Sequence, residues 1–174
     1  LAPRHSFHAP ATEIELVHRD SEIRQLSRLV MKQTIDFVSE REKGEHITFH
    51  MANSALEKAG QLSWDYGVES LVILAEHAKK RGVRLALENV RSGWTGDPDL
   101  LLQLATEGGV DITFDAGHAA AGRWVQSGNG TAVDFLRKIL PKVITAHLYE
   151  IEVDEPRPST HLPPANMENL APIV

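Results

Sequence analysis

The sequence predicts an α/β fold in which parallel strands close into a barrel inside a ring of helices. Five short strand-like runs alternate with helix-like segments, which is the element order of a parallel sheet. Each run also has one small or polar face and one apolar face. Central strands of an open sheet lie under helices on both sides and are apolar on both faces, so the polar face favours a barrel interior.

The five strand-like runs recur at the spacing of one strand and one helix. They cover residues 4–8, 46–50, 84–88, 111–115 and 143–147, and their last residues lie 42, 38, 27 and 32 positions apart. A complete (β/α)8 TIM barrel needs about 250 residues, so a chain of 174 residues is expected to supply five to six of its units. We therefore expect a single domain, residues 1–174, that lacks the first strand and the closing C-terminal strand or strands.

The segments between the strands have the apolar stripes and the boundary residues of helices. The expected helices run from Asp20 to about Gly44, from 65 to 81 before Gly82, from Asp97 and Pro98 to about 108, and from 131 to 140 before Pro141. Their apolar faces are those that an outer ring of helices requires. These helices contain no residue pattern that indicates a catalytic or binding site.

The composition restricts the class of protein. The chain is 42% hydrophobic and 24% charged and has a net charge of −6, which is typical of a globular domain. No long apolar run or secretory signal is present in the sequence, so we expect a cytoplasmic protein with no membrane partner. A negative charge gives no overall attraction to nucleic acid, which favours a small-molecule substrate.

A side chain of the metal-ligand type ends each predicted strand. The chain has no cysteine, so imidazole and carboxylate are its strong ligands for a transition metal. The strand-end residues are His8, His50, Glu88, Asp115 and His147. Strand ends of a barrel converge on one mouth, and this set of nitrogen and oxygen atoms suits a divalent cation such as zinc, manganese, iron, cobalt or magnesium.

A structural role is the alternative for these residues. A histidine at a strand end is more often hydrogen-bonded than metal-bound, and ligand assignments need several converging groups. The two carboxylates need a partner in either case, because a buried charge is costly unless it is paired or bound to a cation. A salt bridge from Arg84 or Arg4 is the alternative explanation for Glu88 and Asp115.

Several short segments resemble the xylose-isomerase-like TIM-barrel superfamily, which includes sugar-phosphate isomerases and epimerases as well as endonuclease IV of AP endonuclease family 2. They are Phe7-His8-Ala9-Pro10, Thr48-Phe49-His50, Leu87-Glu88-Asn89, Phe114-Asp115-Ala116-Gly117-His118, Ala146-His147-Leu148 and His161-Leu162-Pro163-Pro164. The resemblance implies that Glu88, Asp115 and His147 hold a central metal, with a fourth ligand, a glutamate, on a strand beyond Val174. It also implies that His8, His50, His118 and His161 are further zinc ligands or contacts to substrate.

The chain departs from the patterns of this superfamily at three places. Ser159 stands where the endonuclease branch has an aspartate two residues before the histidine matching His161, which speaks against a third zinc ion. The glycine-rich turn that the family has after this histidine, at the mouth of the site, is absent. Residues 9–13 lack the tyrosine and asparagine with which the endonuclease branch enters the DNA groove, which weighs against DNA repair. Nucleic acid is therefore not expected as a partner.

Four residues in the loops after the strands are candidates for substrate binding. Arg91 and Arg123 could contact a phosphate or carboxylate, with a solvated surface position as the alternative. Trp94 and Trp124 could form apolar walls for a sugar, with loop packing as an equal alternative. His18 and His77 are expected to be exposed to solvent.

Three functions remain open. The first is a metal-dependent isomerase or epimerase of a sugar or sugar phosphate, in which Glu88 is both ligand and base, His118 orients a hydroxyl, and a metal stabilises an enediolate. The second is a zinc phosphodiesterase of the endonuclease IV type acting on abasic DNA, which predicts that His8 and His50 share a metal with Glu88. The third is a non-catalytic, metal-binding barrel fragment whose exposed sheet edges favour a homo-oligomer.

Overall fold

The computed structural model describes residues 6–10, 14–41, 46–51, 60–149, 151–153 and 160–162. Its elements are, in order, β1 (Ser6–His8), α1 (Ser21–Arg41), β2 (His46–Phe49), α3 (Trp64–Arg81), β3 (Arg84–Glu88), η1 (Trp94–Gly96), α4 (Pro98–Glu107), β4 (Asp111–Asp115), α5 (Ala116–Ala121), α6 (Arg123–Gln126), α7 (Ala132–Ile139), η2 (Leu140–Lys142), β5 (Val143–His147), β6 (Ile151–Val153) and β7 (Thr160–Leu162). None of the helices described is both long and apolar enough to cross a membrane.

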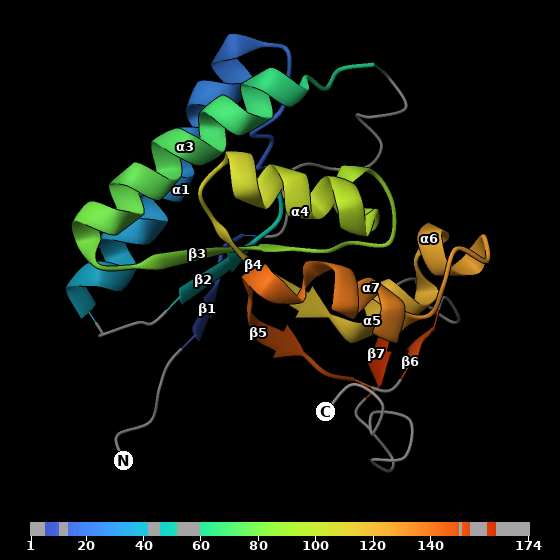
Figure 1. Cartoon of the computed structure of the whole chain (residues 1–174). Coiled ribbons are helices and arrows are strands. Elements are labelled where there is room, and N and C mark those ends of the chain that lie inside the picture. The colour runs from blue at the N-terminus through green and yellow to red at the C-terminus, as the bar shows by residue number, and fades with distance from the viewer. Residues whose placement is uncertain are drawn as a thin grey trace.

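Five parallel strands form a curled half-barrel, in the order β1-β2-β3-β4-β5 (Figure 1). Strands β3, β4 and β5 have the bounds that the sequence predicts, β1 agrees within the described residues, and β2 ends at Phe49, one residue earlier than predicted. Strands β6 and β7 form a separate antiparallel pair, which the sequence did not predict. The α/β barrel class is confirmed.

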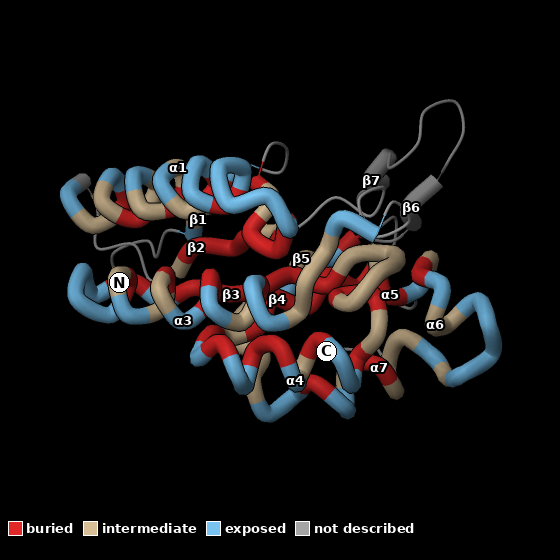
Figure 2. The backbone as a smooth tube through the Cα atoms, turned by 90° about the horizontal axis from the view of Figure 1, so that it is seen from above, coloured by how far each residue is buried: buried red, intermediate tan, exposed pale blue. Residues whose placement is uncertain are grey.

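The outer face of the sheet and the helices share the core. Ile47, Phe49, Leu87 and Phe114 point outward from the strands and are fully buried. In Figure 2 the buried residues follow the strands and the sides of the helices turned toward them, while the opposite helix sides are exposed. Burying apolar side chains on this face stabilises the fold by about 1.5–3 kcal/mol for each large residue.

The inner face is small and polar, as predicted. Thr48 on β2 and Thr113 on β4 are buried, and their Oγ1 atoms lie 2.8 Å apart, so that one hydroxyl donates to the other. Ala86 is the neighbour of Thr48 on the strand between them, and its small side chain leaves room for this contact. The hydroxyl pair satisfies two polar groups that burial would otherwise leave without hydrogen bonds.

The helix ends follow from their sequence signals. Helix α3 ends at Gly82, whose φ of 71° is the left-handed conformation that glycine adopts readily. Asp97 caps α4 by accepting hydrogen bonds from the backbone N–H groups of residues 99 and 100. Thr131 and Asp134 form a reciprocal capping box at the start of α7.

The expected exposure of His18 is wrong, because this side chain is buried. Its Nδ1 accepts a hydrogen bond of 2.9 Å from the backbone N–H of Asp20. Leu16 and Val17, just before it, are fully buried, so residues 16–18 lie in the core. His77 is half-buried and lies 2.8 Å from Asp36 on α1.

Candidate metal centre

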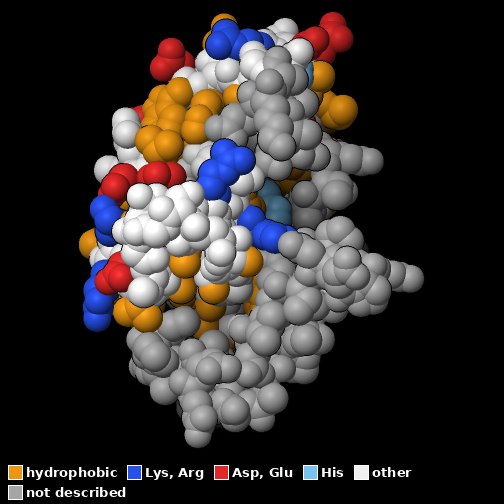
Figure 3. All heavy atoms as spheres, turned by 90° about the vertical axis from the view of Figure 1, so that its right-hand side faces the viewer, with side chains coloured by type: hydrophobic (Ala, Val, Ile, Leu, Met, Phe, Trp, Pro, Cys, Tyr) orange, Lys and Arg blue, Asp and Glu red, His pale blue; other side chains and the backbone are white. Residues whose placement is uncertain are grey.

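The five predicted ligand residues lie at the carboxyl ends of the five strands. Glu88, Asp115 and His147 are the last residues of β3, β4 and β5, and His8 is the last residue of β1. His50 directly follows β2. Because the strands are parallel, these ends meet at one side of the sheet. Figure 3 looks at the molecule from the right-hand side of Figure 1, and shows histidine between lysine or arginine side chains.

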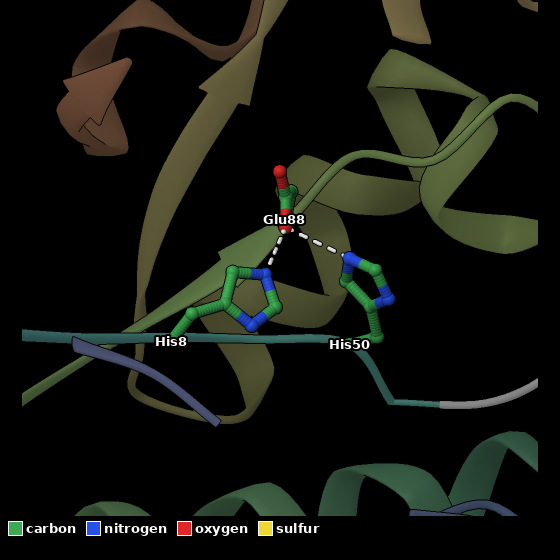
Figure 4. Close-up of side chains that lie close together, drawn as sticks. All are labelled: His8, His50 and Glu88. Atoms are coloured by element: carbon green, nitrogen blue, oxygen red, sulfur yellow. Dashed lines mark hydrogen bonds and ion pairs between the residues drawn. The ribbon is translucent and has the colours of Figure 1, made fainter. Parts of the chain in front are cut away.

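Glu88 is the centre of the group and is 2% exposed. Its Oε2 lies 2.9 Å from Nε2 of His8 and 2.8 Å from Nε2 of His50, and both imidazoles point toward it (Figure 4). Its Oε1 lies 2.7 Å from Nδ1 of His147. Each carboxylate oxygen therefore faces a different part of the site.

Asp115 is held at the same depth and is 1% exposed. Its Oδ2 lies 3.7 Å from Nδ1 of His147. Its Oδ1 accepts hydrogen bonds from the backbone N–H of His118, at 2.6 Å, and from the hydroxyl of Tyr149, at 2.8 Å. The side chain of Asn89 pairs with its backbone, donating to the carbonyl at 2.9 Å and accepting from the N–H at 2.7 Å.

The carboxylates and imidazoles shift one another's pKa values. Burial alone raises the pKa of Glu88, but hydrogen bonds from His147, His50 and His8 outweigh it and lower the pKa. The carboxylates of Asp115 and Glu88 raise the pKa of His147 to about 10. The hydrogen bond to Glu88 likewise raises the pKa of His8. The site thus favours positive charge around two buried carboxylates.

The salt-bridge alternative fails for Arg84. The Nε of Arg84 lies 2.9 Å from Oδ2 of Asp111, and both residues begin their strands, at the end of the sheet opposite Glu88. Arg4 lies outside the described residues. The described side chains that lie within hydrogen-bonding distance of Glu88 are imidazoles, which are metal ligands when neutral.

The donor atoms fit a divalent metal. Two groups, His8-His50-Glu88 and Glu88-Asp115-His118, each have ligand atoms within 4.8 Å of one another. The Nδ1 of His8 donates to the backbone carbonyl of Ala9 at 2.6 Å, the orienting bond typical of a histidine that binds a metal through its other nitrogen. Glu88 belongs to both groups, so the residues suit two neighbouring ions that share one carboxylate. His161 lies on β7, and its side chain is outside the described part of the structure.

The predicted substrate residues divide into two pairs. The backbone N–H of Arg123 donates to the carbonyl of Arg91 at 2.8 Å, which joins the loop after β3 to the start of α6. Trp94 packs edge-to-face against Trp64, with ring centroids 5.4 Å apart. Trp124 packs in the same way against Phe135 of α7, at 5.8 Å. The structure thus brings the arginine backbones together and gives both tryptophans a packing role.

Sequence reasoning missed two residues that hold the ligands in place. Asn89 directly follows Glu88, and its side-chain amide can both donate and accept hydrogen bonds with the backbone of a neighbouring strand end. Tyr149 lies two residues after His147, beyond the end of β5. Both residues are close to a predicted ligand in the sequence, but the residue that each one contacts, Asp115, lies 26 or 34 positions away.

Comparisons with known proteins show the family and the fold. The family described as "Xylose isomerase-like TIM barrel" matches residues 4–165. The uncharacterized protein MJ0008 of Methanocaldococcus jannaschii is 32% identical over 168 residues, covering 97% of this chain and 64% of the relative.

Two solved structures share the fold. A D-tagatose 3-epimerase-like protein has a TM-score of 0.70 at 20% identity, covering 86% of this chain and 57% of its own. Endonuclease IV from Thermus thermophilus has a TM-score of 0.65 at 17% identity, covering 91% and 58%. The chain therefore spans 57–64% of the length of these three proteins. With a family match across most of its length, the chain belongs to the xylose isomerase-like TIM-barrel family.

Proposed function

We propose that this centre binds two divalent metal ions and hydrolyses a phosphoester of a small, sugar-like molecule. The observation that carries the proposal is the position of Glu88, which presents Oε2 to His8 and His50 and Oε1 to His147. In a single-metal isomerase the pair His8 and His50 would bind no metal. Two metals that share Glu88 give a role to both.

The ligands would divide between two positions. His8, His50 and Glu88 would hold one ion, and Glu88, Asp115 and His147 the other. His147 is chosen over His118 as the third ligand because its Nδ1 lies 2.7 Å from Oε1 of Glu88 and 3.7 Å from Oδ2 of Asp115. Two such ions supply Lewis acidity, lowering the pKa of water toward neutrality and stabilising charge on phosphoryl oxygens. The three imidazoles favour zinc, cobalt or manganese over magnesium, which prefers oxygen ligands.

The protein side chains would position the reactants. Three imidazole hydrogen bonds lower the pKa of Glu88 in the metal-free site. Arg91 and Arg123, whose backbones are hydrogen-bonded, would bind the phosphate through their guanidinium groups. His118 would orient a substrate hydroxyl, and Trp94 and Trp124 would support the surrounding loops.

An isomerase or epimerase is the second candidate. It is favoured by Glu88, Asp115 and His147, which meet at the carboxyl ends of three adjacent strands, and by the fold that the chain shares with the epimerase-like structure. Here one metal would polarise a sugar carbonyl, and the residues His8 and His50 would only support Glu88 through hydrogen bonds.

Three measurements distinguish the phosphoesterase from the isomerase: the metal content, the hydrolysis of a phosphodiester and the epimerisation of a sugar. We expect the chain to bind two zinc or manganese ions, to hydrolyse bis(p-nitrophenyl) phosphate, and to lose one ion and the hydrolysis in His50→Ala. The matched control is His77→Ala, which removes a half-buried imidazole paired with Asp36 on the outer helices. One bound ion, unaffected by His50→Ala, together with epimerisation of a ketohexose would overturn the proposal in favour of the isomerase.

Two further outcomes test the remaining alternatives. Cleavage of an abasic oligonucleotide with no hydrolysis of the small diester would contradict the small-molecule substrate. A folded chain that binds metal but shows none of these activities would favour the non-catalytic, metal-binding fragment, and a folded chain that binds no metal would contradict all three functions.

A further inference from the structure

Tyr149 makes contacts that the proposed reaction has not used. Its side chain is buried, and its hydroxyl lies 2.8 Å from Oδ1 of Asp115 and 3.4 Å from Nδ1 of His118. A phenol has one hydrogen to donate, and the shorter contact, to a carboxylate that can only accept, takes it. The Nδ1 of His118 is then the donor to the phenol oxygen.

The two donors to Asp115 both act on one oxygen. The backbone N–H of His118 and the hydroxyl of Tyr149 bind Oδ1, while Oδ2 lies toward His147, 3.7 Å from its Nδ1. A carboxylate with one oxygen engaged by donors presents the other to a cation, because the rotation that would exchange them breaks two hydrogen bonds. The hydrogen bonds to Oδ1, the oxygen turned away from His147, therefore fix the orientation of the Asp115 carboxylate.

The fold makes space for this tyrosine. A Cβ atom at Gly117 would lie 2.0–2.6 Å from ring and hydroxyl atoms of Tyr149, closer than any real contact. Glycine at 117, on the first turn of α5, is thus required for the ring to reach Asp115. The same turn supplies the N–H of His118, so α5 and Tyr149 act on the carboxylate together.

We propose that Tyr149 is a positioning residue for one of the two metal positions. It fixes Asp115 so that Oδ2 is available to the ion held with Glu88 and His147. It does not act on the position formed by His8 and His50, which lie at the other oxygen of Glu88. The inference rests on the proposed two-metal centre and adds to it a residue whose loss weakens one position selectively.

The test is a stepwise Co²⁺ titration of the full chain after removal of metal by a chelator, followed by visible absorption. We expect two binding steps, one of which is absent in His50→Ala. In Tyr149→Phe we expect that step to be unchanged and the other to weaken about 10–100-fold, the usual effect of losing an orienting partner of a ligand. Tyr66→Phe is the matched control, because Tyr66 is the other tyrosine of the chain and its ring lies under Arg24 on α1.

A second variant keeps the inference falsifiable. Gly117→Ala displaces the ring without changing Tyr149, and we expect the same selective loss. Circular dichroism of the metal-free variants checks that both fold. Equal weakening of both steps, or two steps within twofold of the wild type in Tyr149→Phe, would overturn the role of Tyr149. If the wild type shows two Co²⁺ binding steps but hydrolyses no phosphodiester, the proposed function alone is overturned. If the wild type binds no Co²⁺, both the proposed function and the role of Tyr149 are overturned.

Discussion

Glu88 is a buried charge whose surroundings decide what the site can do. A carboxylate at 2% exposure is costly unless its charge is compensated. Three imidazoles compensate it here, at 2.7–2.9 Å. Protons and a metal ion compete for the same imidazole nitrogens, so the metal-free site holds protons where the loaded site would hold cations.

Replacing Glu88 by glutamine tests its shared role. We expect Glu88→Gln to lose both metal-binding steps, because the neutral amide supplies no negative oxygen to either position. Asp111→Asn is the matched control, since this carboxylate lies at the opposite strand ends and pairs with Arg84. Metal titration by calorimetry gives the result. Retention of one full-strength step in Glu88→Gln would show that the two positions do not share this residue.

The stability of the metal-free chain should depend on pH through His147. Its folded pKa is about 10, against 6.5 for the ordinary group, so between these values the folded state holds a proton that the unfolded state releases. The stabilisation is complete below about pH 6.5 and is lost as the pH rises through 10. Solvent screening reduces its size, because the side chain is 37% exposed.

Thermal unfolding in a chelator measures this dependence. We expect the melting temperature to be lower at pH 9.5 than at pH 6.5, and the difference to shrink in His147→Gln. An equal difference in the variant would assign the pH dependence to other groups.

Asn89 should matter for folding as well as for the site. Its amide makes two hydrogen bonds to the buried backbone of Asp115, and leaving such groups unpaired costs about 1–3 kcal/mol. We expect Asn89→Ala to lower the free energy of unfolding by about this amount in urea denaturation. Asn129→Ala, in an exposed loop, should change it by less than about 0.5 kcal/mol. Equal losses of unfolding free energy in Asn89→Ala and Asn129→Ala would contradict the role of Asn89 in joining the ends of β3 and β4.

At the scale of the elements, the sheet register and the helix caps position the site. Asp115 and His147 are directly paired in the register of β4 and β5, so their side chains start from neighbouring backbone positions. Helix α5 begins directly after Asp115, which ties the strand end to a helix N-terminus. Ligand positions are therefore set by regular structure rather than by long loops.

The two N-cap residues of α7 and α3 offer a matched test of capping. Thr131 accepts a hydrogen bond from the backbone N–H of Asp134 and forms a capping box, whereas Ser63 makes no side-chain capping bond. We expect Thr131→Ala to lower the free energy of unfolding by about 1 kcal/mol and Ser63→Ala by a few tenths. Chemical denaturation measures both. A larger loss in Ser63→Ala would refute this account of the caps.

The elements were largely predictable from sequence, and the contacts between them were not. Strands β3 to β5 and the caps Asp97 and Thr131 follow from local patterns of two or four residues. The burial of His18 and the pairing of Asn89 with Asp115 depend on segments distant in sequence. The converging ligands were predictable because the strands are parallel, which places every strand end at one side.

At the scale of the whole molecule, the parallel half-barrel brings five distant ligand residues to one side of the sheet. A metal bound there bridges strands β1 to β5, so it should stabilise the fold. An ion at one hundred times its dissociation constant adds about 2.7 kcal/mol. For a domain of this size that corresponds to a rise in melting temperature of about 5–10 °C.

Differential scanning fluorimetry with Zn²⁺ or Mn²⁺ against a chelator tests this stabilisation. The metal-induced rise in melting temperature should be absent in Glu88→Gln and unchanged in Asp111→Asn. A rise of equal size in Glu88→Gln would place the stabilising ion elsewhere on the protein.

The carboxylate of Glu88, with one oxygen toward each half of the site, makes the two positions thermodynamically dependent on each other. The two cations would divide the charge of one carboxylate and repel each other, so an ion at either position lowers the affinity of the other, and linkage makes this effect reciprocal. Occupancy would then rise less steeply with free metal concentration than for independent sites. The chain would pass through a state with one ion bound over a wide range of metal supply.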